Sequence, residues 1–193
     1  MKYTALIFAL LVLVLGNNVA AQTDMPTAPT ASRKDAAAAM GKLKMFVGTF
    51  NSSSKLSDEK TGNLVSEDTG KIVNRMRAGG MVFTIEKESV NTKGGKYDDI
   101  MAFQFDARSG KMRAFLFSND PNPREIAVEI KDNVMILNYE PGVNIITRET
   151  ITAEKDGNVR WLIEHKQADG SYRKTREIVA TRQKEMKEVK QTN

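Results

Sequence analysis

The chain has no cysteine and a single histidine, His165, and each shortage excludes a class of chemistry. Without cysteine there can be no disulfide, no thiolate zinc site and no thiol nucleophile. With one histidine a three-histidine zinc site is impossible, and a Ser-His-Asp hydrolase would have to use His165. The sequence also lacks the G-x-S-x-G elbow of many such hydrolases.

Clustered charge is missing too. The sequence holds 29 basic and 24 acidic residues, a net charge of +5, and they are spread along the chain. Nucleic-acid binders usually gather basic residues into a stripe, so we expect no nucleic-acid partner. The apolar run at residues 6–15 is shorter than the ~20 residues that a membrane-spanning helix needs, so we expect no membrane span.

The N-terminus carries the order of features that is typical of an export signal. Lys2 is followed by the apolar run and then by the small residues Val19-Ala20-Ala21. We therefore predict a signal peptide at residues 1–21 and a periplasmic or secreted protein. Residues 22–33, rich in Pro, Thr, Ala and Ser, are predicted to be a flexible linker, and residues 183–193 a charged tail.

Residues 34–182 are predicted to fold as one domain. Four alanines within residues 34–44 favour a short helix at its start. From Phe46 onward, short runs rich in Val, Ile, Phe and Thr alternate with tight-turn signals such as Ala78-Gly79-Gly80. Most of these runs join their sequence neighbours through short turns, which indicates an antiparallel meander.

A meander of about nine or ten strands usually closes on itself, because closure removes exposed strand edges. We therefore predict an all-β fold, an antiparallel up-and-down barrel of about 8–10 strands with a short N-terminal helix. Residues 56–70 are polar and weakly patterned, so we expect them to form a long loop near the barrel mouth.

Several short motifs then resemble those of a known family. Gly48-Thr49-Phe50 is similar to the Gly-x-Trp entrance of lipocalin-like (calycin) barrels, with Phe in place of Trp, and Arg182 stands where such barrels often carry an arginine packed over that aromatic ring. Phe103-Gln-Phe-Asp106, with the aromatic strand after Gly110, resembles a bacterial secreted lipocalin-like domain of unknown function. The resemblance covers roughly residues 40–182 and implies that the domain of residues 34–182 forms a lipocalin-like cup for a small apolar molecule.

Phenylalanine and methionine recur on alternate positions of the predicted strands. Such side chains suit an adaptable apolar pocket, although they could equally fill the barrel as core. The residues predicted to bind a ligand are Phe83, Met101, Phe103, Phe105, Tyr139, Arg148, Trp161 and His165.

Two of these candidates carry a specific chemical idea and a plainer alternative. Arg148 either holds a carboxylate headgroup inside the cavity or pairs on the outer face with an acid such as Glu164 or Glu177. His165 shares a strand face with Trp161, so it either ligates a haem iron or is a rim residue. Apart from this haem alternative we expect no cofactor, and we expect no metal.

The favoured function is non-catalytic binding of a small apolar or amphipathic ligand in the cavity of an exported barrel. One alternative is an enzyme on a calycin-type barrel, an isomerase or hydrolase of a small lipophilic substrate. A buried acid with a perturbed pKa beside Arg148 would favour that alternative. The other is an envelope protein-interaction module, with a filled barrel and a large exposed apolar patch.

Overall fold

The computed structural model of the chain describes residues 31–118, 124–142 and 145–184. The predicted signal peptide, residues 22–30 of the predicted linker and residues 185–193 of the predicted tail lie outside the described residues.

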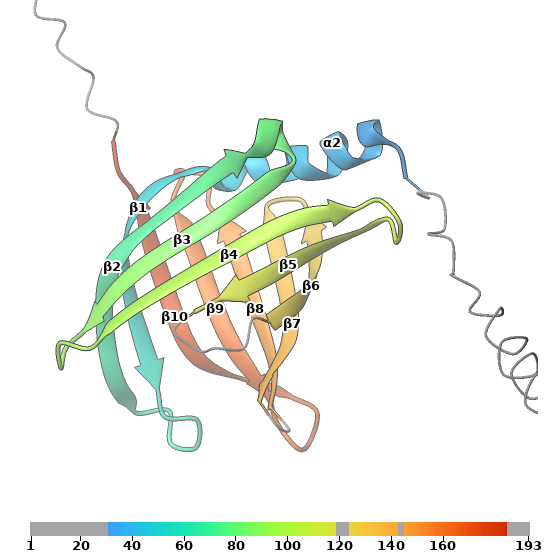
Figure 1. The fold of residues 1–193 in the computed structure, drawn as a ribbon. Helices are drawn as coiled ribbons and strands as arrows, with labels where there is room; N and C mark the ends of the chain where they lie inside the picture. Colours follow the sequence, from blue (N-terminus) through green and yellow to red (C-terminus); the bar gives the residue numbers. More distant parts are fainter. Residues whose placement is uncertain (1–30, 119–123, 143–144, 185–193) are drawn as a thin grey trace, which may run out of the picture.

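The described residues form one closed barrel of ten antiparallel strands, in which each strand pairs with its sequence neighbours and β1 closes the ring against β10 (Figure 1). The strands are β1 Gly48–Ser57, β2 Leu64–Arg77, β3 Val82–Asn91, β4 Lys96–Asp106, β5 Lys111–Phe117, β6 Arg124–Lys131, β7 Val134–Gly142, β8 Ile145–Ala153, β9 Val159–Lys166 and β10 Tyr172–Arg182. The predicted all-β, up-and-down barrel with a short N-terminal helix is therefore confirmed.

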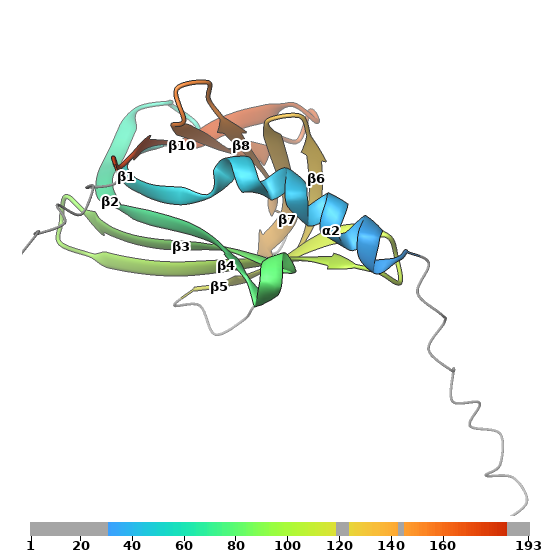
Figure 2. The same cartoon turned by 90° about the horizontal axis from the view of Figure 1, so that it is seen from above.

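The helical segment crosses one end of this barrel (Figure 2). It consists of helix α2, Arg33–Gly41, and the 3-10 helix η1, Lys42–Phe46. Ser32 and Asp35 start α2 with a reciprocal capping box. Met40, Leu43 and Phe46 point into the barrel and are at most 1% exposed, so they plug this end.

Arg182 fastens the helical segment to the barrel. Its guanidinium lies 4.8 Å from the centre of the Phe50 ring, and it donates hydrogen bonds to the carbonyls of Val47 at 2.7 Å and Gly157 at 2.9 Å. A side chain at Gly48 would collide with it, since a Cβ there would lie 2.2 Å from Nη1 of Arg182. The predicted packing of Arg182 over Phe50 is thus confirmed.

The strand β2 differs from the sequence prediction. Residues 56–70 were expected to be a loop, yet β2 begins at Leu64. The residues from Leu64 to Gly70 already pair with β1, and Gly70 lies opposite Ser52. The inward positions here are taken by Asp68 and Gly70 and not by apolar residues. Without an apolar alternation, the two-residue period that identifies a strand is missing from the sequence.

Candidate ligand-binding site

The interior of the barrel is divided along its axis. Next to the helical segment the inward side chains are apolar and at most 3% exposed, apart from the buried Asn74, which donates to the Phe46 carbonyl at 2.9 Å. We call this part the filled half: Phe50, Ile72, Phe83, Phe103, Ala114, Ile126, Met135 and Ile151. Toward the other end polar side chains point inward as well as apolar ones, and we call this part the polar half after its polar members: Ser54, Asp68, Lys87, Ser89, Asp99, Tyr139, Thr147, Glu149 and Arg176.

A cavity of about 210 Å³ lies in the polar half. Pockets for drug-sized ligands span about 300–1,000 Å³, so this one suits a smaller molecule or one end of a larger one. Its apolar lining is Ile85, Met101, Leu116, Trp161, Ile163 and Ile178, and its polar lining is Lys87, Asp99, Ser118, Arg124, Tyr139, Glu149 and Arg176.

Glu149 is the most deeply buried acid of the cavity wall, with 3% of its surface exposed. It lies on β8 between two strands that each supply a donor: the Tyr139 hydroxyl of β7 donates to Oε1, and Nε1 of Trp161 on β9 donates to Oε2 at 2.8 Å. Burial raises the pKa of Glu149, although both hydrogen bonds act against that rise. Burial, with the neighbouring Glu149 charge, also raises the pKa of Tyr139.

Two basic side chains of the polar half form loose ion pairs. Nζ of Lys87 lies 3.5 Å from Oδ2 of Asp99, and Nη1 of Arg176 lies 3.6 Å from Oδ2 of Asp68. The Lys87 side chain is only 9% exposed and that of Asp68 only 3%. These distances are longer than those of charge-assisted hydrogen bonds.

Other polar atoms of this half have no hydrogen-bond partner among the described residues. They are the hydroxyl oxygens of Ser54, Ser89 and Thr147 and Oδ2 of Asp68, whereas the filled half has one such atom among the described residues, Oδ1 of Asn74. Leaving a buried polar atom unpaired costs about 1–3 kcal/mol, and nearly all such atoms in folded proteins are paired with protein, water or ligand. The polar half is therefore suited to polar contents and not to side-chain packing.

The turn between β1 and β2 is fixed against the β9–β10 hairpin at this end of the barrel. Nη1 of Arg173 donates to the carbonyls of Glu59 at 2.6 Å and Lys60 at 3.2 Å. Nε2 of Gln167 donates to the Glu59 carboxylate at 2.9 Å, and Nδ1 of His165 lies 3.4 Å from the same oxygen. The hydrogen bond from Gln167 and the nearby His165 lower the pKa of Glu59.

The predicted binding residues are divided between these regions. Met101, Tyr139 and Trp161 line the cavity. Phe83 and Phe103 lie in the filled half with ring centres 5.5 Å apart, which corresponds to the core-filling alternative. Phe105 packs half-buried against the core near the helical segment. Whether any of them binds a ligand stays a prediction.

Arg148 does not line the cavity. Its guanidinium is 2.9 Å from Oε2 of Glu164 on β9 and lies 3.8 Å over the Tyr172 ring, on the outer face of the barrel. The inward positions of β8 are Thr147, Glu149 and Ile151, so the arginine has the opposite phase. Of the two predicted roles, the structure has the cross-strand pair with Glu164. The prediction that Arg148 holds a carboxylate headgroup inside the cavity is wrong, because its side chain is on the outer face.

His165 lies at the open rim, where its side chain is 27% exposed and faces Glu59. Haem ligation by His165 stays a prediction. No group of three or more histidine or acidic residues in the described ranges is arranged to hold a metal ion.

The sequence analysis missed the charged residues of the cavity, although a signal for them exists. Phe83 and Ile85 alternate along one face of their strand, and continuing the same alternation leads directly to Lys87 and Ser89. Glu149 was not among the predicted residues, because its neighbour Arg148, which has the opposite strand phase, was predicted to face the cavity. Asp99 continues the alternation of Phe103 and Met101 in the same way, and Arg176 continues that of Ala180 and Ile178, up to the bulge between Lys174 and Arg176.

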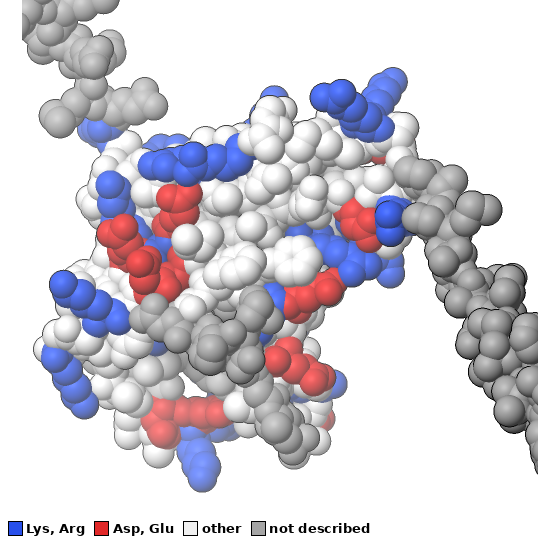
Figure 3. All heavy atoms as spheres, in the orientation of Figure 1, with Lys and Arg blue, Asp and Glu red and all other residues white. Residues whose placement is uncertain are grey.

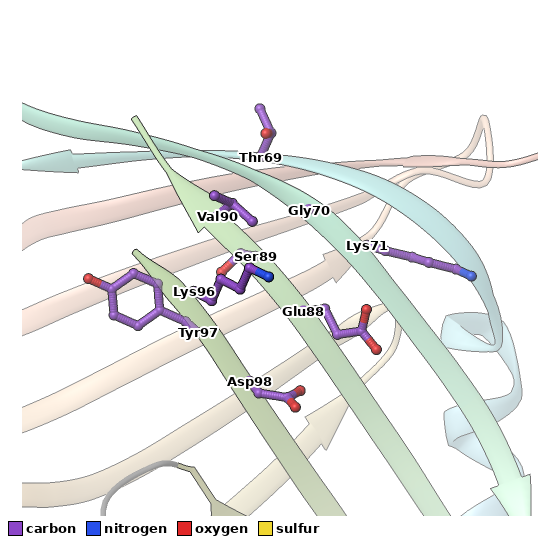
Figure 4. Close-up of a pocket in the computed structure, with 9 residues that line it drawn as sticks. All are labelled: Thr69, Gly70, Lys71, Glu88, Ser89, Val90, Lys96, Tyr97 and Asp98. Carbon is purple, nitrogen blue, oxygen red and sulfur yellow. The ribbon is translucent and has the colours of Figure 1, made fainter. Parts of the chain in front are cut away.

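A second hollow, of about 480 Å³, lies on the outside of the barrel over β2, β3 and β4 (Figure 4). Most of its lining side chains are exposed, including Lys71, Glu88, Lys96 and Asp98. Figure 4 shows Tyr97 and Asp98 on opposite sides of their strand, so they do not converge on one point. We regard this hollow as a surface depression and the cavity of the polar half as the candidate site.

The outer face of the barrel also carries an apolar patch. Ile100 on β4 and Phe117 on β5 are cross-strand partners, and both are exposed together with Phe115. Figure 3 shows an uncharged area over these strands, with acidic and basic side chains around it. The alternative of a protein-interaction module requires such a patch together with a filled interior. The patch is present, but the interior is filled in one half only, so the structure meets one of the two conditions.

No helix in the described part of the chain has the length and apolar character needed to cross a bilayer.

No family model and no curated protein matches the chain. Among solved structures, Rv2717c from M. tuberculosis is similar with a TM-score of 0.53 and 11% identity, over 76% of this chain and 98% of that one. The S-type phycobiliprotein lyase CPES from Guillardia theta is similar with a TM-score of 0.52 and 13% identity, over 77% and 94% of the two chains. At such identities the likeness shows a shared calycin-like barrel fold, and membership of the secreted lipocalin-like family stays a prediction.

Proposed function

We propose that this protein binds a small amphipathic molecule in the cavity of the polar half, without chemical conversion. The observation that carries the proposal is the division of one barrel interior into a tightly packed half and a half that keeps a cavity with polar walls. A barrel that needed its interior for stability alone would be packed with apolar side chains throughout.

The lining of the cavity supports an amphipathic ligand. Trp161, Met101 and Ile178 offer an apolar surface, while Lys87 and Glu149 offer charge on the same walls. Small closed barrels have an interior that side chains can fill or that can hold one small ligand, and a cavity left open favours the second. With the predicted signal peptide, binding would take place in the periplasm or outside the cell.

Trp161 makes the proposal easy to test, because it is the single tryptophan of the chain and lines the cavity. We expect its fluorescence to change and saturate when six-carbon amphiphiles such as hexanoate, 1-hexanol and hexylamine are titrated into the protein. A response to at least one of them would support a binding cavity.

Two neighbouring residues on β9 give a matched pair of variants. Ile163 lines the cavity, whereas Leu162 has the opposite strand phase, so Ile163→Phe fills the cavity and Leu162→Phe adds the same volume outside it. We expect Ile163→Phe to weaken the response at least about tenfold and Leu162→Phe to leave it unchanged. Equal behaviour of the two variants, or no response in the wild type, would contradict the proposal.

Glu149 favours a second candidate, an enzyme that abstracts a proton from a bound substrate. A buried carboxyl with a raised pKa is a common general base, and the acid lies beside Arg148 in the sequence. Nitrobenzisoxazole, whose ring opens when a carboxylate removes its C–H proton, is a suitable probe. Ring opening that is lost in Glu149→Gln and kept in Glu164→Gln would support this candidate; equal rates in both variants would reject it.

A further inference from the structure

We propose that the ligand is a small organic acid, whose carboxylate lies between Lys87 and Arg176 while its apolar part rests on Trp161 and Ile178. The inference rests on the proposed function, since it names the chemical class that the same cavity takes. It is argued from the hydrogen-bonding capacity left on each side of the cavity.

Lys87 is the first part of the argument. Its ammonium group has three donors, its side chain is 9% exposed, and Nζ lies 3.5 Å from Oδ2 of Asp99, its ion-pair partner in the described part of the chain. One carboxylate at that distance leaves donors of the ammonium unsatisfied. Burying an ammonium with donors to spare is costly, so the site favours an additional acceptor beside Lys87.

Arg176 repeats this arrangement on β10. Its guanidinium offers five donors, and its contact with Oδ2 of Asp68 is 3.6 Å long. That oxygen has no hydrogen-bond partner among the described residues, so the contact is ionic without a hydrogen bond. A planar guanidinium pairs well with both oxygens of a carboxylate, which makes a carboxylate a better fit than a single hydroxyl.

The opposite wall offers less to a cationic ligand. Both oxygens of Glu149 already accept hydrogen bonds, from Tyr139 and Trp161, so an incoming amine would have to share them. Asp99 is one-third exposed and already has Lys87 as its partner. The charge of Glu149 would also repel a carboxylate from that wall, which places the acidic end of the ligand toward Lys87 and Arg176.

The experiment compares three molecules with the same six-carbon chain, hexanoate, 1-hexanol and hexylamine, by titration of Trp161 fluorescence. We expect hexanoate to bind about tenfold or more tightly than the alcohol, because a charge-assisted hydrogen bond contributes more than a neutral one. We expect Lys87→Met to remove that preference while the alcohol still binds.

Arg148→Met is the matched control, since it removes one positive charge from the outer face. We expect it to leave the preference for hexanoate intact. Arg176→Lys serves as the second cavity variant, because it keeps a positive charge beside the buried Asp68 and changes only the planar fork. It should lower hexanoate affinity without altering binding of the alcohol.

The outcomes separate this inference from the proposed function. If the alcohol or the amine binds as tightly as hexanoate, and Lys87→Met has no effect, the cavity binds ligands but the organic-acid class is overturned. If none of the three molecules changes Trp161 fluorescence, both the inference and the proposed function fail.

Discussion

The filled half and the polar half of the barrel are built from the same ten strands but meet different demands. Along β3 the inward residues change from Phe83 and Ile85 to Lys87, and along β8 they change from Ile151 to Glu149. In the filled half, apolar packing stabilises the fold. In the polar half, buried charges lower stability but leave a cavity with hydrogen-bonding walls. A continuous strand can therefore supply the core at one end and a candidate binding site at the other.

The strongest way to break this comparison is to remove a large side chain from each environment. Phe103 is fully buried in the filled half, while Phe115 lies on the outer face of the next strand with 37% of its surface exposed. We expect Phe103→Ala to lower the free energy of unfolding by about 3–5 kcal/mol, and Phe115→Ala by less than about 1 kcal/mol. Urea denaturation of both variants measures the difference. Similar losses in the two would show that the filled half is not the stabilising part.

A smaller loss of stability is expected when an arginine that binds loop carbonyls is removed at either end of the barrel. Arg182 donates to two carbonyls and covers Phe50, whereas the exposed Arg173 holds the β1–β2 turn at the cavity end. We expect Arg182→Met to lower the free energy of unfolding by about 2–3 kcal/mol and Arg173→Met by about 1 kcal/mol or less. Thermal unfolding of the two variants in parallel gives the comparison, and a larger loss for Arg173→Met would reverse it.

The subtlest difference between the regions is a dependence on pH. The pKa of Glu149 is raised by burial in the folded protein, so its ionisation destabilises the fold at neutral pH, and this penalty disappears as the pH falls through the raised pKa. The pKa of Glu86 on the outer face is lowered, chiefly by the hydrogen bond from Arg77, so its stabilising contribution is present above the ordinary pKa and is lost as the pH falls through the lowered value.

On acidification from neutral pH we therefore expect the wild type to gain stability relative to Glu149→Gln and to lose stability relative to Glu86→Gln. Urea unfolding of the three proteins over the same pH series measures both slopes. If the two slopes had the same sign, Glu149 would behave as a solvated carboxylate, and the description of the polar half as buried would be wrong.

The same division explains what could be predicted from the sequence. The barrel could be predicted because turn signals such as Ala168-Asp169-Gly170 separate strands with an apolar alternation. Met101 and Trp161 could be placed in the cavity because they continue that alternation. Charged residues in a strand are normally taken to face solvent, so the inward Asp68 and Glu149 carried the wrong signal, and the first part of β2 was missed for the same reason.

The loose ion pairs could not be predicted from the sequence. Lys87 and Asp99 are cross-strand partners through the register of β3 with β4, which follows from the turn between these strands. Arg176 reaches Asp68 past β1, because β10 and β2 both flank that strand in the closed ring. Closure of the barrel is what brings Arg176 and Asp68 together, whereas Lys87 and Asp99 meet within one hairpin.

The central claim is that a ligand enters the polar half and leaves the filled half undisturbed. The most direct measurement is an NMR titration with hexanoate, 1-hexanol and hexylamine that follows the methionine methyl groups and the single tryptophan N–H. Met101 and Trp161 line the cavity, whereas Met135 is fully buried in the filled half. We predict that the resonances of Met101 and Trp161 shift in a saturable way while that of Met135 stays in place. Unchanged Met101 and Trp161 resonances with all three molecules would contradict the account.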